Sequence, residues 1–246
     1  MEESTDFGFE KIPKKEKAPR VAQVFKSVAN RYDLMNDLMS FGLHRLWKRI
    51  AINHCALQPG FKVLDVAGGT GDLALQMASL VGNTGQVISS DIQPDMLSLG
   101  RDKLLDHGVC QNVAFVQANA ESLPFQSDYF DVVTIGFGLR NVTHQPNALQ
   151  SIYRILKPGG KLIILEFSTL KNEKLAPLYD WYSFEVLPRL GKLVTNDSAS
   201  YQYLAESIRK HPDQETLKAL ILKAGFSNCD IHNLMNGVVA IHVCLK

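Results

Sequence analysis

The stretch Val63-Leu64-Asp65-Val66-Ala67-Gly68-Gly69-Thr70-Gly71-Asp72 decides the fold predicted for this chain of 246 residues. Its first half is a short apolar run, which indicates a buried strand, and a glycine loop follows directly. Residues 72–77 then continue with helical periodicity. Glycines let the backbone approach a ligand that a Cβ atom would hold away. Because ligands of open α/β sheets bind beyond the carboxyl ends of the strands, the stretch predicts an α/β fold with a ligand site at this loop.

Two classes of cofactor compete for the loop. Residues 69–74 fit the pattern G-x-G-x-x-G/A of dinucleotide sites. A pyrophosphate, however, prefers bare amides at a helix N-terminus with no anion nearby. Asp65 precedes the loop and Asp72 lies just inside the helix, and two carboxylates suit the positively charged S-adenosylmethionine. We therefore favour adenosylmethionine over NAD, and a tight turn capped by Asp72 is the purely structural alternative.

A further acid follows the loop by about 20 residues, at the end of a second strand. Residues 87–91 read Val-Ile-Ser-Ser-Asp, so that this strand ends in Asp91. A carboxylate there can accept hydrogen bonds from both hydroxyls of a ribose, which either cofactor carries. Asp91 supports a nucleoside ligand and does not discriminate between the two.

Strands and helices alternate through the middle of the chain. Apolar periodicity predicts strands at 62–66, 86–90, 113–117, 130–135 and 161–166, with helices at 71–81, 94–107 and 145–156. Residues 157–160, Lys-Pro-Gly-Gly, predict a turn before the last of these strands. Such alternation implies a mostly parallel sheet with helices on both faces.

The two ends of the chain depart from this rhythm. Before the sheet we expect helices at 21–29 and 43–55 with a loop at 31–37, which together form an N-terminal helical cap over residues 21–58. After it, residues 168–224 read as a helical insertion on the substrate side, with helices near 172–186, 199–209 and 213–223. Two closing strands follow at about 226–233 and 237–245. Residues 21–246 are thus predicted to be a single domain.

Charge and cysteine usage exclude several classes of protein. Lys and Arg number 26 against 25 for Asp and Glu, a net charge of +1 that gives no general attraction to nucleic acid. Residues 1–20 mix acids and bases without an apolar core, so we expect a mobile, solvated tail. The chain shows no signal peptide and no membrane-spanning stretch, and its four cysteines form no C-x-x-C pair. We expect a soluble, cytoplasmic protein with reduced thiols and no metal.

Two further segments fall at the carboxyl edge of the predicted sheet. Residues 119–125 begin with Asn119 and Ala120 and are placed to read the rim of an adenine, although an ordinary proline loop explains them equally well. Residues 137–142 place Arg140 beside Asn141, a cationic fork next to an amide, which suits an oxyanion. The alternative for Arg140 is a salt bridge at the sheet edge.

Some residues remain ambiguous from the pattern alone. Aromatic side chains are dense in the helical insertion, where they form either core or the wall of an apolar channel: Tyr179, Trp181, Tyr182, Phe184, Tyr201 and Tyr203. His44 and His211 are candidate bases, but a single histidine is more often structural.

From about Lys15 to its end, the chain resembles the ubiquinone/menaquinone biosynthesis C-methyltransferases. The glycine loop, Asp91 and residues 157–160 are shared by class I methyltransferases in general. The narrower motifs are residues 24–29, 32–37, 44–48, 137–142, 182–184 and 200–209, with Pro212 and Gln214. One residue departs from the pattern: Gly136 stands where this family usually has serine, which puts one hydroxyl contact to the cofactor in doubt.

The resemblance implies a Rossmann-like class I methyltransferase that uses S-adenosylmethionine to methylate a ring carbon of a polyprenylated quinol. The substrate is then 2-polyprenyl-6-methoxy-1,4-benzoquinol in ubiquinone synthesis, demethylmenaquinol in menaquinone synthesis, or both. It also implies transient contact with the membrane surface from the cytoplasmic side, and it leaves open a homodimer and other quinone-biosynthesis enzymes as partners. The expected cofactor residues are Asp65, Gly68, Gly69, Thr70, Gly71, Asp91, Asn119, Ala120 and Gly136.

At the quinol head the resemblance places Tyr32, Arg140 and Asn141 as catalytic residues. Arg140, supported by Asn141, would stabilise the oxyanion that makes a ring carbon nucleophilic, and Tyr32, Asp33 or a water molecule would remove the ring proton. Competing readings are a methyltransferase for another phenolic molecule, a NAD-dependent oxidoreductase, and a non-catalytic scaffold of a quinone-synthesis assembly.

Overall fold

The computed structural model describes residues 4–28, 32–109, 111–171, 177, 181–186, 188–189, 191–192 and 198–246. For Val28, Tyr32, Asp33, Met35 and Leu38 it describes the backbone only. Within these ranges no helix has the length and apolar content that crossing a bilayer requires. The same ranges contain no group of three or more His, Cys, Asp or Glu side chains arranged to hold a metal ion.

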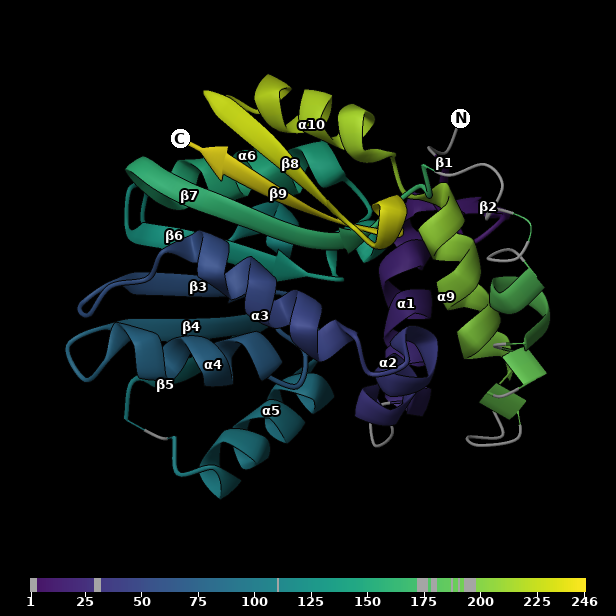
Figure 1. Ribbon diagram of the computed structural model, residues 1–246, viewed down its shortest axis with the longest axis horizontal. Coiled ribbons are helices and arrows are strands. Elements are labelled where there is room, and N and C mark those ends of the chain that lie inside the picture. The colour runs from purple at the N-terminus through teal and green to yellow at the C-terminus, as the bar shows by residue number, and fades with distance from the viewer. Residues whose placement is uncertain are drawn as a thin grey trace.

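A seven-stranded sheet in the order β5-β4-β3-β6-β7-β9-β8 forms the body of the molecule (Figure 1). Strands β3 to β7 pair in parallel, and β9 pairs antiparallel with both β7 and β8. Their bounds are β3 Lys62–Val66, β4 Gln86–Asp91, β5 Val113–Gln117, β6 Phe130–Gly136, β7 Leu156–Phe167, β8 Asn228–Leu234 and β9 Val239–Leu245. The predicted mostly parallel α/β sheet is confirmed.

Helices cover both faces of the sheet, as the alternation predicts. They are α3 His44–Cys55, α4 Asp72–Val81, α5 Pro94–Asp106, α6 Gln145–Ile155 and α10 Gln214–Lys223. Strand β3 shows how the faces divide: Leu64 and Val66 join the apolar cluster that contains residues of α6 and α10. Val63, which precedes Leu64, joins the cluster that contains residues of α3 and α4. Successive strand side chains point to opposite faces, so the two clusters are the two layers of the core.

The remaining elements gather at the carboxyl edge of the parallel strands, at the right of Figure 1. They are the hairpin β1 Ser4–Phe7 and β2 Glu10–Pro13, α1 Lys14–Val28, α2 Tyr32–Ser40, the π-helix Tyr182–Val186 and α9 Ser198–Lys210. The helices predicted at 199–209 and 213–223 are confirmed as α9 and α10. Most of the helix predicted at 172–186 lies outside the described residues.

Two expectations for the N-terminal region are wrong. Residues 4–20 form the hairpin and the start of α1 in place of a solvated tail, and Ile12 is only 2% exposed. The polar composition hid this because the hairpin is held by contacts with α9, far along the chain: Phe7 stacks on Tyr203 at 4.3 Å between ring centroids, and the Phe9 amide donates to Glu206. The loop predicted at 31–37 is the helix α2 from Tyr32 onward.

The turn predicted at residues 157–160 is part of β7, which begins at Leu156. The pairing of β6 and β7 is irregular there and becomes regular from Lys161, the predicted start of the strand. Gly160 leaves no room for a side chain, since a Cβ atom would lie 2.8 Å from the carbonyl oxygen of Lys157. Glycine is therefore required at this position, as predicted, but it lies in a strand with a bulge and not in a turn.

Candidate active site

The glycine loop runs from β3 into α4, and close packing explains its composition. A Cβ atom on Gly68 would lie 2.3 Å from Ser89 Oγ. Gly71 has φ of +76°, and a Cβ atom there would meet Leu104 at 2.9 Å. Strand order also reverses here, since β4 pairs with one edge of β3 and β6 with the other. Such a switch point is where open α/β sheets bind ligands.

A cavity opens beside the loop at the carboxyl ends of the strands. The sequence-predicted residues that line it are Gly69, Asp91, Asn119, Ala120, Gly136 and Asn141. They come from the segments that follow β3, β4, β5 and β6, so tertiary structure brings together the parts that the sequence predicted one by one. Helix α1 covers the cavity with the apolar residues Ala18, Val21 and Phe25. An apolar cover with convergent polar groups is typical of a small-molecule site.

Asp91 is one of two acidic residues in the described part of the chain that line this cavity, and Glu121 is the other. The Oδ2 of Asp91 accepts the Gly69 amide at 3.0 Å, and its Oδ1 accepts the Gln93 amide at 2.9 Å. Burial raises the pKa of Asp91 above its usual range, although these amide hydrogen bonds act in the opposite direction. Each carboxylate oxygen can accept a second hydrogen bond, so Asp91 can hold ribose hydroxyls while it also fixes the glycine loop.

Asp65 lies behind the loop and does not line the cavity. Its Oδ1 accepts a hydrogen bond from Thr134 Oγ1 at 2.7 Å. Its Oδ2 has no hydrogen-bond partner in the described part of the chain. Burial raises the pKa of Asp65 to about 7, which the bond from Thr134 and the nearby Lys48 only partly oppose. A cationic ligand above the loop would therefore favour the ionised form of Asp65.

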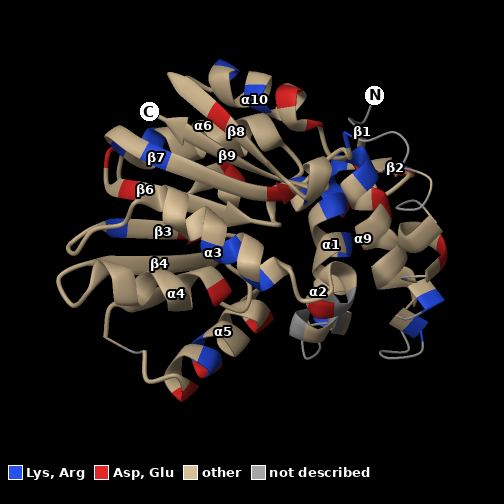
Figure 2. Cartoon of the chain, viewed as in Figure 1, with Lys and Arg blue, Asp and Glu red and all other residues tan. Residues whose placement is uncertain are grey.

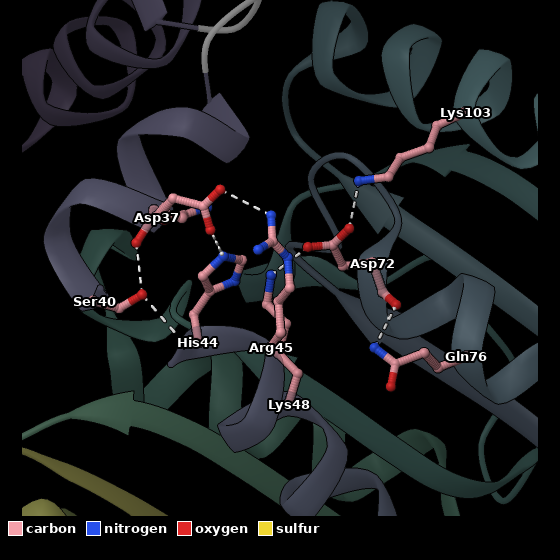
Figure 3. A network of polar contacts seen from close by, with 9 residues as sticks. Asp37, Ser40, His44, Arg45, Lys48, Asp72, Gln76 and Lys103 are labelled. Atoms are coloured by element: carbon pink, nitrogen blue, oxygen red, sulfur yellow. Dashed lines mark hydrogen bonds and ion pairs between the residues drawn. The ribbon is translucent and has the colours of Figure 1, made fainter. Parts of the chain in front are cut away.

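Asp72 is held by two lysines, as Figure 3 shows. Lys48 from α3 and Lys103 from α5 each place Nζ 2.5 Å from one of its oxygens. Although burial opposes its charge, the two ammonium groups lower the pKa of Asp72 to about 2. The sequence argument that Asp72 supplies negative charge to a cofactor is wrong, because that charge is already compensated. Asp72 instead ties three helices together at the start of α4.

A second part of the same network joins α2 to α3 (Figure 3). His44 Nε2 contacts Asp37 Oδ1 at 2.9 Å, and Arg45 Nη2 contacts Asp37 Oδ2 at 2.8 Å. Burial lowers the pKa of His44, so it is largely neutral near pH 7. Its contacts give His44 a structural role in the cap, and it does not line the cavity.

The catalytic residues predicted at the quinol head are separated by the structure. Asn141 lines the cavity, and its Oδ1 accepts a hydrogen bond from Tyr203 at 3.1 Å. Arg140 is buried, and its Nη1 donates to Glu166 Oε1 at 2.6 Å and to the carbonyl oxygen of Phe137 at 2.7 Å. It thus makes the salt bridge at the sheet edge, and it lines a neighbouring cavity instead. The side chain of Tyr32 lies outside what the structure describes.

Gly68, Thr70 and Gly71 shape the loop without lining the cavity. Gly136 does line it, and a Cβ atom there would lie 2.9 Å from Leu73 Cδ1. The serine usual in the family would therefore require the Leu73 side chain to shift. Gly136 and Leu73 form one packing unit in this chain.

Sequence reasoning missed the partners of the predicted acids. Lys48, Lys103, Thr134 and Glu166 each contact an assigned residue from a distant part of the chain. Thr134 in β6 and Glu166 in β7 could have been identified from the sequence, because each is a polar residue inside an apolar strand. The two lysines carried no signal, because lysine is common on exposed helix faces.

The fold has many relatives of known structure. A SAM dependent methyltransferase from Aquifex aeolicus superposes with a TM-score of 0.62 at 17% identity, covering 86% of this chain and 95% of that one. The putative methyltransferase in a complex with the Haloferax volcanii Trm112 methyltransferase activator gives 0.65 at 16% identity, covering 92% and 96%. At these identities the likeness establishes the fold alone, a Rossmann-like class I methyltransferase fold.

Relatives in sequence are much nearer. The ubiquinone/menaquinone biosynthesis C-methyltransferase UbiE of Ectopseudomonas mendocina (strain ymp) is 59% identical over 246 residues, covering 100% of this chain and 96% of that protein. The UbiE of Legionella pneumophila (strain Corby) is 57% identical over 246 residues, covering 100% and 98%. The model of the ubiE/COQ5 methyltransferase family matches residues 13–246. This chain belongs to the ubiE/COQ5 methyltransferase family.

Proposed function

We propose that this protein transfers a methyl group from S-adenosylmethionine to a ring carbon of a polyprenylated quinol. The acceptor is 2-polyprenyl-6-methoxy-1,4-benzoquinol in ubiquinone synthesis, demethylmenaquinol in menaquinone synthesis, or both. The relatives that share more than half of its residues over its full length carry the name of this activity. The observation that supports it most strongly is the cavity in which Asp91, Asn119 and Asn141 converge beside the glycine loop.

The residues present fit adenosylmethionine. When bound, this cofactor supplies an electrophilic methyl group on a sulfonium. Asp91 and Asn119 would hold its ribose and adenine, and α1 would cover the adenine with Val21 and Phe25. The Asp65 carboxylate behind the loop, with one oxygen unpartnered in the described part of the chain, complements the positive charge of the cofactor. A pyrophosphate would prefer bare backbone amides with no acid nearby, and the acids beside this loop therefore disfavour a dinucleotide.

The acceptor carbon must be activated by ionisation of a neighbouring hydroxyl. A free phenol has a pKa of about 10, so little phenolate forms near pH 7 unless a positive group stabilises it. We assign that stabilisation to Arg140, and the orientation of the ring to Asn141, which Tyr203 holds by a hydrogen bond. Covering of the cavity by α1 excludes water from the reacting atoms, which strengthens these interactions. Tyr32 remains our candidate for a contact with the quinol head.

A polyprenyl tail keeps the acceptor in a bilayer, so we infer that the protein touches the membrane surface. Support comes from exposed aromatic residues, since Phe41 of the cap is 77% exposed and Trp181 of the helical insertion is 57% exposed. Phe41 lies near Tyr182, with ring centroids 5.2 Å apart. Aromatic side chains are favoured at the boundary between lipid and water. Contact with other quinone-biosynthesis enzymes and the formation of a homodimer remain predictions from the sequence.

The test is methyl transfer from labelled adenosylmethionine to chemically reduced demethyl-quinols in detergent micelles, with benzoquinol and naphthoquinol acceptors compared. Label in a ring methyl group of either product supports the proposal, and the ratio identifies the pathway. Absence of transfer to both acceptors, while adenosylhomocysteine still raises the melting temperature, would contradict it. Arg140→Lys tests the oxyanion role, because it keeps the charge but loses the planar fork. We expect turnover to fall at least about tenfold, and unchanged turnover would exclude that role.

A further inference from the structure

A second cavity, of about 190 Å³, lies beside the first. It is bounded by the N-terminal hairpin, α1, the segment after β6 and the end of α9, and the polar residues that line it include Asp6, Lys17, Arg140, Tyr203, Lys210 and His211. An engineered cavity of about 150 Å³ takes up benzene, so this space accommodates one substituted aromatic ring. Figure 2 shows Lys and Arg on the hairpin, α1 and α9 around this part of the molecule.

His211 lines this cavity and has a ring nitrogen without a partner in the described part of the chain. It follows the last residue of α9 and is only 7% exposed. Its Nε2 has no hydrogen-bond partner among the residues that the structure describes. A buried polar atom without a partner costs free energy, which a bound ligand would recover. The sequence offers His211 only as a candidate base, and the proposed function gives it no role.

The neighbours of His211 decide which of its nitrogens carries the hydrogen. Gln145 Nε2 donates to the carbonyl oxygen of Leu139 at 3.2 Å, which orients the amide with its nitrogen inward. The same nitrogen lies 3.5 Å from His211 Nδ1. Because Nδ1 faces a donor, it acts as the acceptor, and Nε2 carries the hydrogen. Burial lowers the pKa of His211 to about 4, so the ring is neutral near pH 7 and Nε2 is a hydrogen-bond donor.

The cations Lys17, Arg140 and Lys210 and the carboxylate of Asp6 line the cavity around this donor. Lys17 is 7% exposed, and its Nζ donates to the carbonyl oxygen of Val142 at 3.3 Å. Arg140 is also buried, with Glu166 bound at Nη1, and Lys210 lies 3.7 Å from Asp6 at the rim. An ammonium group has three donors, so Lys17 retains capacity for a ligand. Donors and cations together suit an oxygen that carries negative charge.

The second cavity adjoins the cofactor cavity across a thin wall. Val142 and Thr143 line both cavities. Arg140 and Asn141, adjacent in the chain, line one cavity each, and the hydrogen bond from Tyr203 to Asn141 spans the wall. The ring of an acceptor whose oxygen binds at His211 would therefore lie next to the cofactor cavity.

We propose that the second cavity binds the ionised hydroxyl of the aromatic acceptor, with His211 Nε2 and Lys17 Nζ as its hydrogen-bond partners. The inference rests on the proposed function and extends the oxyanion role from Arg140 to these two residues. The hydroxyl releases its proton to water on binding, and no covalent bond of the protein changes. Negative charge held on the oxygen raises the electron density of the adjacent ring carbon, which is the carbon to be methylated.

The direct test uses 4-nitrophenol, a single-ring phenol whose anion is yellow, with the full chain saturated in adenosylhomocysteine. A pH titration of the absorbance gives the pKa of the bound probe. Because opposite charges nearby lower the pKa of an acid by about one to three units, we expect the bound probe to ionise at least about one unit below the free probe. Failure to bind, or an unshifted pKa, would overturn the inference.

Three variants assign the effect to the cavity. His211→Phe keeps the ring shape and loses the donor, and Lys17→Met keeps the stem and loses the charge. Each should weaken binding of the anionic probe about tenfold or more and return its pKa toward the free value. The control is His242→Gln, which alters another buried histidine, bonded to the carbonyl oxygen of Gln214 and absent from both cavities. Equal effects of His242→Gln and His211→Phe on the probe would overturn the inference.

Steady-state kinetics separate this inference from the proposed function. In His211→Phe and Lys17→Met we expect the KM for the demethyl-quinol to rise about tenfold or more, while the affinity for adenosylhomocysteine changes less than about twofold. If wild-type protein methylates the quinol and both variants keep its KM, the inference is wrong and the proposed function stands. If wild-type protein methylates neither quinol although the probe binds at His211, the proposed function fails by itself.

Discussion

The two ends of the glycine loop place the same side chain in opposite electrostatic settings. Asp65, before the loop, is buried with one oxygen unpartnered in the described part of the chain, and burial raises its pKa to about 7. Asp72, after the loop, is also largely buried, yet Lys48 and Lys103 lower its pKa to about 2. A shift of one pKa unit corresponds to about 1.4 kcal/mol. The charge on Asp65 therefore costs the fold stability, whereas the charge on Asp72 contributes to it.

This contrast indicates that Asp65 serves the ligand and that Asp72 stabilises the fold. A buried carboxylate without a counter-ion is tolerated where a ligand brings the opposite charge. A carboxylate between two lysines has its counter-ions already and serves to hold helices together. Four predictions test this division and a fifth concerns Gly136, in order from the largest expected effect to the smallest.

Of these variants, Asp65→Asn should have the largest effect on how the free energy of unfolding depends on pH. In the wild type, the folded state holds the proton of Asp65 up to about pH 7, whereas the unfolded chain releases it near 3.8. The free energy of unfolding should thus fall as pH rises through this window, by up to about 4 kcal/mol from this group. The variant should lack that fall, which urea unfolding at pH 5 and pH 8 measures. Equal slopes in the two proteins would remove the contrast altogether.

The same variant should separate two ligands by charge. Adenosylmethionine carries a sulfonium, and adenosylhomocysteine has a neutral sulfur in its place. If Asp65 serves the cation, Asp65→Asn weakens adenosylmethionine binding more than adenosylhomocysteine binding, which calorimetry compares directly. An equal loss for both would make Asp65 a merely structural residue.

Asp72→Asn should lower stability by about 3 kcal/mol near pH 7, because it leaves a buried lysine without its counter-ion. The Lys48 side chain is only 9% exposed. In the wild type this stabilisation is present above the unfolded pKa of 3.8 and is lost as pH falls toward about 2. Urea unfolding at pH 7 is the measurement, and Lys103→Met, at a more exposed lysine with 24% of its side chain accessible, should cost less. A loss in Asp72→Asn no larger than that control would indicate that the network is only a surface feature.

Lys48→Met should act on both ends of the loop at once. Lys48 lowers the pKa of Asp65 from a distance as well as that of Asp72. Without it the Asp65 pKa should rise above about 7, and the pH at which adenosylmethionine binds half-maximally should rise with it. Carboxyl ¹³C chemical shifts of labelled aspartate, followed through a pH titration, give both pKa values. An unchanged Asp65 titration would show that the two ends are electrostatically independent.

Gly136→Ser should have the smallest effect. Its Cβ atom meets only the flexible end of Leu73, which can shift, so we expect stability to change by less than about 1 kcal/mol. The added hydroxyl lies at the cofactor cavity and should strengthen cofactor binding by a few fold, since a net hydrogen bond contributes about 1 kcal/mol. The matched variant Gly136→Ala has the same contact without the hydroxyl. Equal binding by both variants would mean that backbone contact alone serves this position.

The sequence by itself determined the sheet, the loop and most of the cofactor cavity. Apolar periodicity and glycine spacing are local properties, and parallel strands necessarily end at one edge, so Gly69, Asp91, Asn119 and Gly136 were predictable neighbours. The resemblance added the family, which the comparison with its members establishes.

Only the tertiary structure decided which charges are free and which are compensated. The lysines of Asp72 come from residues 24 positions before it and 31 after it, and Glu166 lies 26 positions beyond Arg140. The hairpin that the composition made look solvated is held by a helix nearly two hundred positions later. Contacts at such separations depend on how layers pack, and packing leaves no periodic signal in the chain. The sequence therefore indicated where the ligand binds, and the fold decided which side chains are available to act on it.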